Sequence, residues 1–452
     1  TPTARSLGGD QTLKGGAGQD TLNATGLNLN LDGGADNDNL SITGRLEVNG
    51  AYQTVKNGFA TLDGGEGDDY LYASSYSNAN LSGGDGNDRL STSSVTKQTL
   101  DGGTGDDTLY AYLDPYYKSQ RDNNIRSEQS LILNGGDGND KLTVRADEYD
   151  QTTSQGLIKV KANGGNGNDE IDIAYPRYGH YSNSGFSEVD IDAGAGDDTI
   201  KASHGLQTTI TTGAGSDTIH LTAEQYKTIL SGTRRYLVEN PTGDLDWHPN
   251  GQSSNNPSDY INIEPDPIVV TDFTTGADGD VLDYSDLLDN SALNYQGNNP
   301  FSNGYLTLTQ SGNNTLIYFD RDGDDGSDHS PITIAILQNV NVDQLTNNNF
   351  KPEFDPTGND DTSDALINGT ELADTLIGGI GVDAISGLGG NDLIDGKAGG
   401  DTLIGGTGDE QLGGSRGDDG RAGGTQPLRP NERRVPLFRR RPLRQLFRRS
   451  SA

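Results

Sequence analysis

A short motif with the pattern G-G-x-G-x-D-x-U, in which U is an apolar residue, recurs through the first half of the chain. Its copies begin at residues 15, 33, 64, 83, 102, 135, 164, 193 and 212. Three copies differ slightly: Asp36 replaces the third Gly of the second copy, and Ala193 and Thr212 replace the first Gly of the last two. Every copy has Asp at its sixth position and Leu or Ile two residues later. Repetition of this kind is typical of stacked folds, in which each repeat is one supersecondary unit.

The residue types of the motif suit one kind of metal ion. The Asp residues at the sixth position are Asp20, Asp38, Asp69, Asp88, Asp107, Asp140, Asp169, Asp198 and Asp217. Glycine allows positive φ and leaves the turn carbonyls open, and Asp adds a carboxylate, so each turn offers the oxygen-only shell that Ca²⁺ prefers. Mg²⁺ is less suited, because it demands tight octahedral geometry and keeps its waters. One isolated copy would be a plain turn, but nine copies in register predict calcium ligands.

The spacing of the motif predicts the architecture. The shortest step between copies is 18 residues, which fits one coil of two short strands and two turns. A single coil cannot bury its thin apolar face, whereas stacked coils pair their strands in parallel and align Leu and Ile residues as ladders. Longer steps, of up to 33 residues, place insertions such as residues 114–129 on the edge opposite the motif turns. We therefore predict an all-β fold, in which residues 1–222 form a parallel β-roll or β-helix with one calcium turn per coil.

The composition also favours a fold that depends on metal. Only 30% of the chain is hydrophobic, and its net charge of −35 disfavours a compact state unless cations neutralise it. This charge argues against nucleic acid and anionic membranes as partners, because both are bound mainly through Lys and Arg. Cys is absent, which excludes disulfides and thiolate metal sites. No stretch approaches the roughly 18 to 20 apolar residues of a transmembrane segment.

Residues 64–71, GGEGDDYL, and 83–90, GGDGNDRL, resemble the nonapeptide repeats of the RTX, or haemolysin-type calcium-binding, family. The resemblance implies calcium ions between successive turns and folding triggered by extracellular calcium. It also implies export by type I secretion machinery without a cleaved N-terminal signal. Contiguous nonapeptides in the family give two turns per coil, whereas residues 1–222 hold one, so a single calcium column is expected there.

Contiguous nonapeptides do follow from Gly369, in the order GTELADTLI, GGIGVDAIS, GLGGNDLID, GKAGGDTLI and GGTGDEQLG. The sixth position holds Asp374, Asp383, Asp392 and Asp401 in the first four and Glu410 in the last. These four Asp residues complete the set of predicted metal ligands. Two nonapeptides per coil predict a second β-roll over residues 367–419, with calcium on both edges.

A different segment separates the two repeat blocks. Residues 223–265 are rich in Pro, Asn and Ser and are predicted to be a linker or irregular cap. Residues 266–350 alternate apolar and polar residues and predict a small β-rich domain, followed by a second linker over residues 351–366. The runs IVVTDF and DVLDYSDLL in this domain resemble the signature of type I secretion target domains. Its acidic loop, residues 320–328, is open to two interpretations: a calcium loop or a plain solvated loop.

The last segment, residues 420–452, is anomalous. From Arg421 onward it contains ten Arg, no Lys and one acidic residue, in a chain whose net charge is otherwise strongly negative. One interpretation is a basic tail that binds nucleic acid or the acidic body. The favoured one is a frameshift, because shifting the reading frame of a gene rich in Gly and Asp codons yields many Arg codons.

No catalytic centre is indicated. The five His residues are scattered without an H-E-x-x-H motif, and the G-x-S-x-G match at residues 413–417 lacks its strand–turn–helix context. We therefore predict a protein that is not an enzyme and whose cofactor is Ca²⁺. The leading hypothesis is a secreted or cell-surface calcium-binding scaffold, with cell-surface or matrix components as further partners.

The alternative is the C-terminal calcium-binding and secretion portion of a secreted toxin or hydrolase. The chain begins at Thr1 and contains no Met, which favours a processed product or a fragment. On this hypothesis an active domain lies upstream of Thr1.

Overall fold

The computed structural model describes residues 3–7, 10–48, 51–54, 58–113, 129–146, 158–174, 188–202, 207–222, 235–239, 245–249, 260–262, 267–295, 299–325, 329–358, 366–378, 382–396, 400–413 and 420–422. The chain divides into two compact units, Thr1–Asp360 and Asp361–Ala452. Each unit is built from parallel strands.

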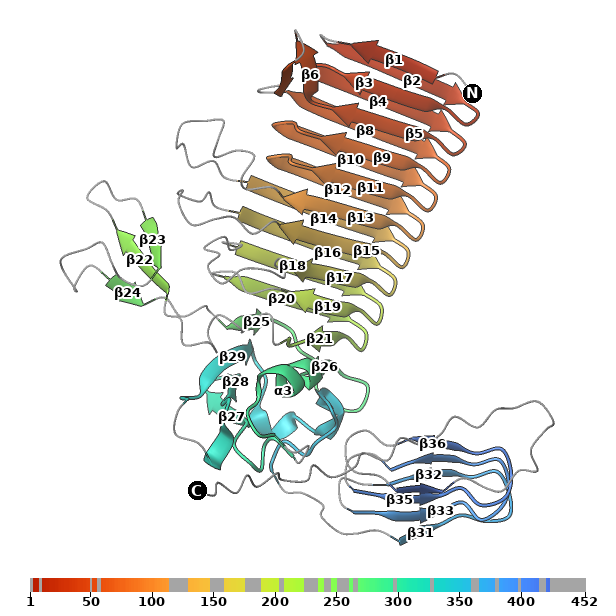
Figure 1. The fold of residues 1–452 in the computed structure, drawn as a ribbon, viewed down its shortest axis with the longest axis vertical. Helices are drawn as coiled ribbons and strands as arrows, with labels where there is room; N and C mark the ends of the chain where they lie inside the picture. The colour runs from red at the N-terminus through yellow and green to blue at the C-terminus, as the bar shows by residue number, and fades with distance from the viewer. Residues whose placement is uncertain are drawn as a thin grey trace, which may run out of the picture. The chain divides into compact units, whose positions relative to one another are not determined.

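The first unit is a roll of stacked coils with two long sheets (Figure 1). Sheet A contains, in spatial order, β1 (Thr3–Leu7), β3 (Thr21–Thr25), β5 (Asn39–Thr43), β9 (Tyr70–Ser74), β11 (Arg89–Ser93), β13 (Thr108–Leu113), β15 (Lys141–Ala146), β17 (Glu170–Ala174), β19 (Thr199–Ala202), β21 (Thr218–His220), β26 (Val281–Asp283) and β30 (Phe350–Lys351). Sheet B contains β2 (Gln11–Ala17), β4 (Asn28–Ala35), β8 (Phe59–Glu66), β10 (Asn78–Asp85), β12 (Lys97–Thr104), β14 (Gln129–Asp137), β16 (Ile158–Asn166), β18 (Glu188–Ala195), β20 (Thr208–Ala214), β25 (Ile268–Val270), β29 (Ile332–Leu337), β28 (Asn314–Phe319) and β27 (Leu306–Ser311).

Each coil passes from a sheet B strand through a motif turn into a sheet A strand, and equivalent residues of neighbouring coils pair. Leu81 pairs with Leu62 and with Leu100 in sheet B, and Leu90 pairs with Leu71 and Leu109 in sheet A. These side chains alternate with polar ones and point inward, where all six are at most 2% exposed. Burial of the ladders drives stacking, because each coil covers the apolar face of the next. The predicted all-β parallel β-roll is confirmed.

Two described insertions lie outside the coil pattern. β6 (Arg45–Val48) and β7 (Ala51–Thr54) form an antiparallel hairpin after β5, where the chain returns from sheet A to sheet B. β22 (Arg235–Glu239), β23 (Leu245–Pro249) and β24 (Tyr260–Asn262) form a small antiparallel sheet within the segment predicted to be a linker or cap. The predicted insertion at residues 114–129 lies outside the described residues, apart from Gln129, which begins β14.

Residues 267–358, here called the capping segment, continue both sheets of the roll. β25 pairs in parallel with β20, and β26 pairs in parallel with β21. β27, β28 and β29 then form an antiparallel extension of sheet B. The segment also contains α3 (Ser285–Ser291) and the short 3-10 helices η2 (Gly323–Asp325), η3 (Val342–Gln344) and η4 (Asn347–Asn349). The sequence predicted a separate β-rich domain of strands here, whereas this segment shares the two sheets of the roll.

The second unit is a smaller roll whose coils are 18 residues long. One sheet contains β31 (Leu366–Asn368), β33 (Ala384–Ser386), β35 (Thr402–Ile404) and β37 (Gly420–Ala422), and the other contains β32 (Thr375–Ile377), β34 (Leu393–Asp395) and β36 (Gln411–Gly413). Ile385, Ile394 and Leu403 form its core. Arg421 pairs with Leu403, so strand pairing continues three residues into the predicted tail. Residues 423–452 lie outside the described residues.

Candidate metal centre

The nine sixth-position Asp residues of the first unit form a buried column along the motif edge of the roll. All nine are 4% exposed or less. The backbone N–H of each Asp donates to Oδ1 of the Asp in the next coil, as between Asp69 and Asp88 and between Asp107 and Asp140, both at 2.7 Å. The same bond joins every pair from Asp20 to Asp217, at 2.6 to 2.8 Å. The column therefore fixes one oxygen of each carboxylate after the first.

The second carboxylate oxygen, Oδ2, has no hydrogen-bond partner in any of the nine Asp residues. A buried polar atom left without a partner costs about 1 to 3 kcal/mol, and more when it is charged. Neighbouring strands are about 4.8 Å apart, so adjacent carboxylates also repel each other, by roughly 3 kcal/mol at an effective dielectric constant of about 20. The ionised carboxylates of this column therefore need positive charge nearby to be stable.

Glycine carbonyls of the following coil complete the oxygen set. A Cβ atom placed on Gly15 would lie 2.5 Å from Oδ2 of Asp20 and 2.5 Å from the carbonyl oxygen of Gly33. At Gly33 the corresponding distances are 2.5 Å to Oδ2 of Asp38 and 2.6 Å to the carbonyl oxygen of Gly64. In the first seven copies the unpartnered carboxylate oxygen and a carbonyl from the next coil thus converge beside a Gly, whereas Ala193 and Thr212 hold this position in the last two copies. Only oxygen atoms are offered, which fits the donor preference of Ca²⁺.

Burial changes the acidity of the column. The pKa of Asp69 and that of Asp107 rise to about 7, mainly through loss of water and in part through neighbouring Asp carboxylates. Burial also raises the pKa of Asp88 to about 6 and that of Asp169 to about 7. These shifts indicate that ionisation of these four carboxylates is unfavourable without a cation, because desolvation and like charge both penalise the charged form.

Surface ion pairs between coils cannot offset this repulsion. Lys159 and Glu188 lie 3.3 Å apart, and Lys161 and Asp190 lie 3.9 Å apart, all with exposed side chains. Exposed pairs of this kind contribute about 0 to 1 kcal/mol each. They are too weak to hold a column of unneutralised carboxylates together.

A second ladder, which the sequence did not predict, runs beside the column at the fifth motif position. The backbone N–H of Asn87 donates to Oδ1 of Asp68 at 2.8 Å, and that of Asp106 donates to Oδ1 of Asn87 at 2.7 Å. These bonds point from each coil to the preceding one, opposite to the bonds of the Asp column. The sequence feature that could have predicted this second ladder is the recurrence of Asn and Asp at the fifth motif position.

At the capping segment the column is continued by Asp280, which has hydrogen bonds at both of its carboxylate oxygens. Asp280 accepts the backbone N–H of Asp217 at 3.1 Å and so takes the place of the next motif Asp. Its Oδ2 accepts the hydroxyl of Thr212 at 3.0 Å and the backbone N–H of Thr274 at 2.7 Å. Asp272 accepts the backbone N–H and the hydroxyl of Thr212, at 2.8 and 3.1 Å. Hydrogen bonds therefore satisfy both carboxylate oxygens of Asp280, whereas Oδ2 of Asp217 stays without a partner.

His220 lies on β21 at the same junction, with Nδ1 3.4 Å from Oδ2 of Asp283. Burial lowers the pKa of His220. In the acidic loop, the backbone N–H of Asp322 donates to Oδ1 of Asp320 at 3.2 Å, and residues 326–328 lie outside the described residues. Both interpretations of that loop stay open.

In the second unit the acidic residues form two ladders, one on each edge. The N–H of Asp374 donates to Asp392 and that of Asp392 to Glu410, at 3.0 and 3.1 Å. On the other edge the N–H of Asp383 donates to Asp401 at 3.0 Å. Asp392, Asp401 and Glu410 each keep a buried oxygen without a hydrogen bond. Glu410 was missing from the predicted ligands, although its register position marked it.

Asp374 differs from the other predicted ligands. It is only partly buried, and its Oδ2 accepts the backbone N–H and the hydroxyl of Thr370, at 2.6 and 2.9 Å. Among the described residues, no three His, Cys, Asp or Glu side chains are grouped in a way that could hold a metal ion. The candidate sites combine carboxylates with main-chain carbonyls instead.

Comparison with known protein families agrees with this geometry. A family model described as the RTX calcium-binding nonapeptide repeat (4 copies) matches residues 6–26, 57–75, 77–94, 97–114, 368–403 and 387–420. This chain carries RTX calcium-binding nonapeptide repeats. RTX repeats bind calcium ions, and such a repeat region is not itself catalytic. The matched RTX segments do not include residues 129–222, where the Asp column continues with the same hydrogen bonds.

No curated protein matches the chain. Among the described residues, no helix has the length and apolar character required to cross a membrane.

Proposed function

We propose that the RTX repeats hold calcium between successive coils through Oδ2 of the sixth-position Asp residues and Gly carbonyls of the following coil. The single observation that carries this proposal is the column of buried Oδ2 atoms without hydrogen-bond partners. The proposed ligands in the first unit are the nine Asp residues named above. In the second unit they are Asp374, Asp383, Asp392 and Asp401, to which Glu410 is added.

The chain's own groups prepare these positions in two ways. The backbone N–H of each preceding coil holds Oδ1, as Asp69 holds Asp88 at 2.7 Å, which orients the carboxylate. The first Gly of the motif leaves room for both oxygens, as at Gly15. Bound calcium would supply the positive charge that this column lacks. Because each Asp contacts two coils, the same groups join ion binding to coil stacking.

We further propose that the protein is exported by type I secretion machinery and folds on extracellular calcium, as a secreted or cell-surface scaffold. Support comes from the RTX repeats, from the net charge of −35 and from the resemblance of the capping segment to secretion target domains. A chain with this charge stays unfolded where free calcium is scarce, because repulsion opposes stacking. No catalytic activity is part of this proposal.

Circular dichroism during a calcium titration, with equilibrium dialysis to count bound ions, tests the calcium proposal. We expect little β-structure in chelator and cooperative folding at roughly 0.1 to 1 mM Ca²⁺, the range of extracellular calcium modules. Asp88→Asn should weaken the response, whereas Asp101→Asn, on the exposed outer face of sheet B, is the matched control. Full β-structure in excess chelator, or equal folding by Mg²⁺, would contradict the proposal.

A further inference from the structure

An open hollow of about 470 Å³ lies on the outer face of sheet B, over its first coils. Its lining comes from the ends of β2, β4 and β8 and from the residue before β2. The lining residues are Asp10, Gln11, Thr12, Asn28, Leu29, Asn30, Phe59 and Thr61. The volume falls in the range of sites that hold small ligands.

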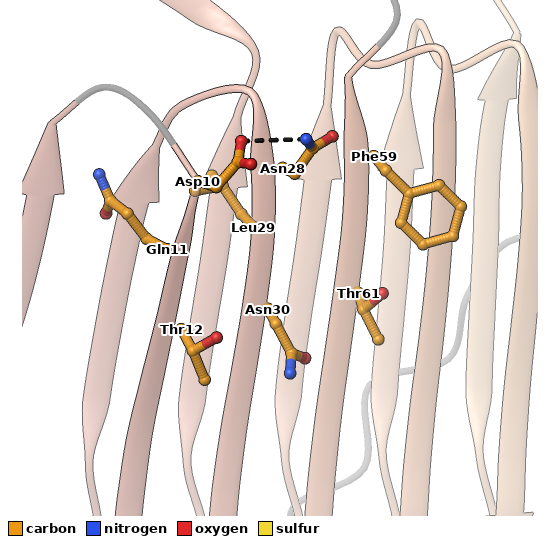
Figure 2. A pocket seen from close by; sticks show the side chains of 8 residues that line it. All are labelled: Asp10, Gln11, Thr12, Asn28, Leu29, Asn30, Phe59 and Thr61. Atoms are coloured by element: carbon orange, nitrogen blue, oxygen red, sulfur yellow. Dashed lines mark hydrogen bonds between the residues drawn. The ribbon is translucent and has the colours of Figure 1, made fainter.

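Strand register arranges the outward side chains of the hollow in rows. Thr12 pairs with Asn30, and Asn30 pairs with Thr61, so these three follow one another across neighbouring strands. Asn28 pairs with Phe59 in the adjacent row. Figure 2 shows the Phe59 ring at one side of the hollow, with the Thr12, Asn30 and Thr61 side chains in a row beside it. Successive groups in a row are about 4.8 Å apart, because this is the distance between strands.

The chemistry of the hollow is that of a hydrogen-bonding surface with little charge. The amide Nδ2 of Asn28 donates to Oδ1 of Asp10 at 2.9 Å, which orients both groups at one end (Figure 2). Asn30, Thr12 and Thr61 add an amide and two hydroxyls, each able to donate and to accept. A matching ligand must therefore present several donors and acceptors on a compact frame.

Charge narrows the class of ligand. Of the eight lining residues, only Asp10 is ionisable, and neither Lys nor Arg is among them. Phosphate, sulfate and carboxylate groups need such cationic partners, and the net charge of −35 repels them further. One carboxylate is also too few for a divalent cation site. The hollow is complementary to a neutral, polyhydroxylated ligand.

Phe59 supplies the apolar part of the surface. Its side chain is 41% exposed, although the neighbouring outward positions of these strands are polar. An exposed aromatic ring beside amides and hydroxyls offers a flat face to C–H groups while the polar groups bind hydroxyls. A pyranose ring has this combination, with C–H groups on its faces and hydroxyls around its rim.

We propose that this hollow binds a neutral pyranose unit of a polysaccharide. Phe59 stacks on the face of the sugar ring, Asn30 and the two Thr hydroxyls bind its hydroxyl groups, and Asp10, held by Asn28, accepts a hydroxyl at the end of the hollow. The surface gives the roll a partner beyond calcium, namely the neutral glycans of a cell coat or matrix.

The test uses the full chain in calcium and biolayer interferometry on immobilised dextran, mannan, galactan and xylan, with alginate as the anionic comparison. We expect binding to at least one neutral polysaccharide and weaker binding to alginate. Phe59→Ala and Asn30→Ala should each reduce the affinity by about tenfold or more. Tyr110→Ala is the matched control, because Tyr110 is a similarly exposed aromatic residue, at 38%, on the outer face of sheet A.

Circular dichroism in calcium accompanies each variant and separates this proposal from the calcium proposal. A chain that is fully β-structured in calcium but binds none of the four neutral polysaccharides contradicts the saccharide site alone. Preference for alginate, or binding that survives both Phe59→Ala and Asn30→Ala, also overturns it. Equal loss of binding in Tyr110→Ala would place the contact on sheet A instead.

Discussion

The backbone N–H of Asp88 donates to Oδ1 of Asp107 in the next coil at 2.7 Å, while Oδ2 of Asp107 is buried without a partner. One carboxylate thus has a hydrogen bond that stacks two coils and a free oxygen that calls for a cation. Stacking and ion binding share the same side chain, so a change at one position affects both.

Position in the column should decide how much damage a substitution causes. The side chain of Asp88 accepts the backbone N–H of Asp69, and Ala would lose this bond, although it would keep the backbone N–H that donates to Asp107. Asp20, at the end, accepts no bond at either oxygen. We expect Asp88→Ala to destabilise the calcium-bound roll by about 2 to 3 kcal/mol and Asp20→Ala by roughly 1 kcal/mol or less. Thermal unfolding in calcium measures both, and equal losses would contradict the stacked column.

Two glycines of a single turn should respond differently to Ala. A Cβ on Gly396 would lie 2.5 Å from Oδ2 of Asp401, whereas a Cβ on Gly400 meets nothing within 4 Å. Gly396→Ala should therefore raise the calcium concentration needed to fold the second unit by about tenfold or more. Gly400→Ala should leave it almost unchanged. A calcium titration of both variants compares them, and the reverse order would show that the oxygens beside Gly396 do not hold the ion.

Acid should stabilise the metal-free roll. The pKa values of Asp69, Asp107 and Asp169 rise from 3.8 to about 7, so the folded state binds protons more tightly than the unfolded chain does. This stabilising contribution is fully present below about pH 4 and is lost as the pH rises through about 6 to 7. In chelator we expect β-structure to decrease over this pH range by circular dichroism. β-Structure that increases with pH in chelator would refute the assignment.

The junction with the capping segment should be independent of calcium. Thr212→Val removes a hydroxyl that lies 3.1 Å from Oδ1 of Asp272 and 3.0 Å from Oδ2 of Asp280, and it leaves the buried carboxylate of Asp280 with one donor fewer. We expect a loss of about 1 to 3 kcal/mol in the stability of this junction. Hydrogen exchange of β25 and β26 in calcium reports it, with Thr108→Val on the exposed face of sheet A as control. Exchange that is unchanged in Thr212→Val would show that these bonds do not hold the junction.

Much of the fold was predictable because its residues repeat. The motif placed Leu71, Leu90 and Leu109 in one column, and the structure pairs them and buries them completely or nearly so. The same register indicated which carboxylates share an edge. Repetition fixes the stacking because every coil must present the same face to the next.

The structural features that the sequence did not reveal are ones that do not repeat along the chain. Asp272 and Asp280 bind Thr212 from about 60 residues away, with no spacing rule to connect them. α3 is seven residues long, too short to show a helical period. Phe59 and Asn30 belong to outward positions, where polarity alone does not separate a binding surface from a solvated face.

The two ends of the first roll are chemically unequal. At one end both carboxylate oxygens of Asp20 are without partners, and at the other Asp280 is satisfied by Asp217, Thr212 and Thr274. The coils should therefore stack first against the capping segment, where Asp280 has all its hydrogen bonds, and then one after another toward Asp20. The capping segment lies C-terminal to every coil that would stack on it, so the ribosome synthesises it after those coils. We therefore expect the coils to stay unstacked during synthesis until the capping segment has been made.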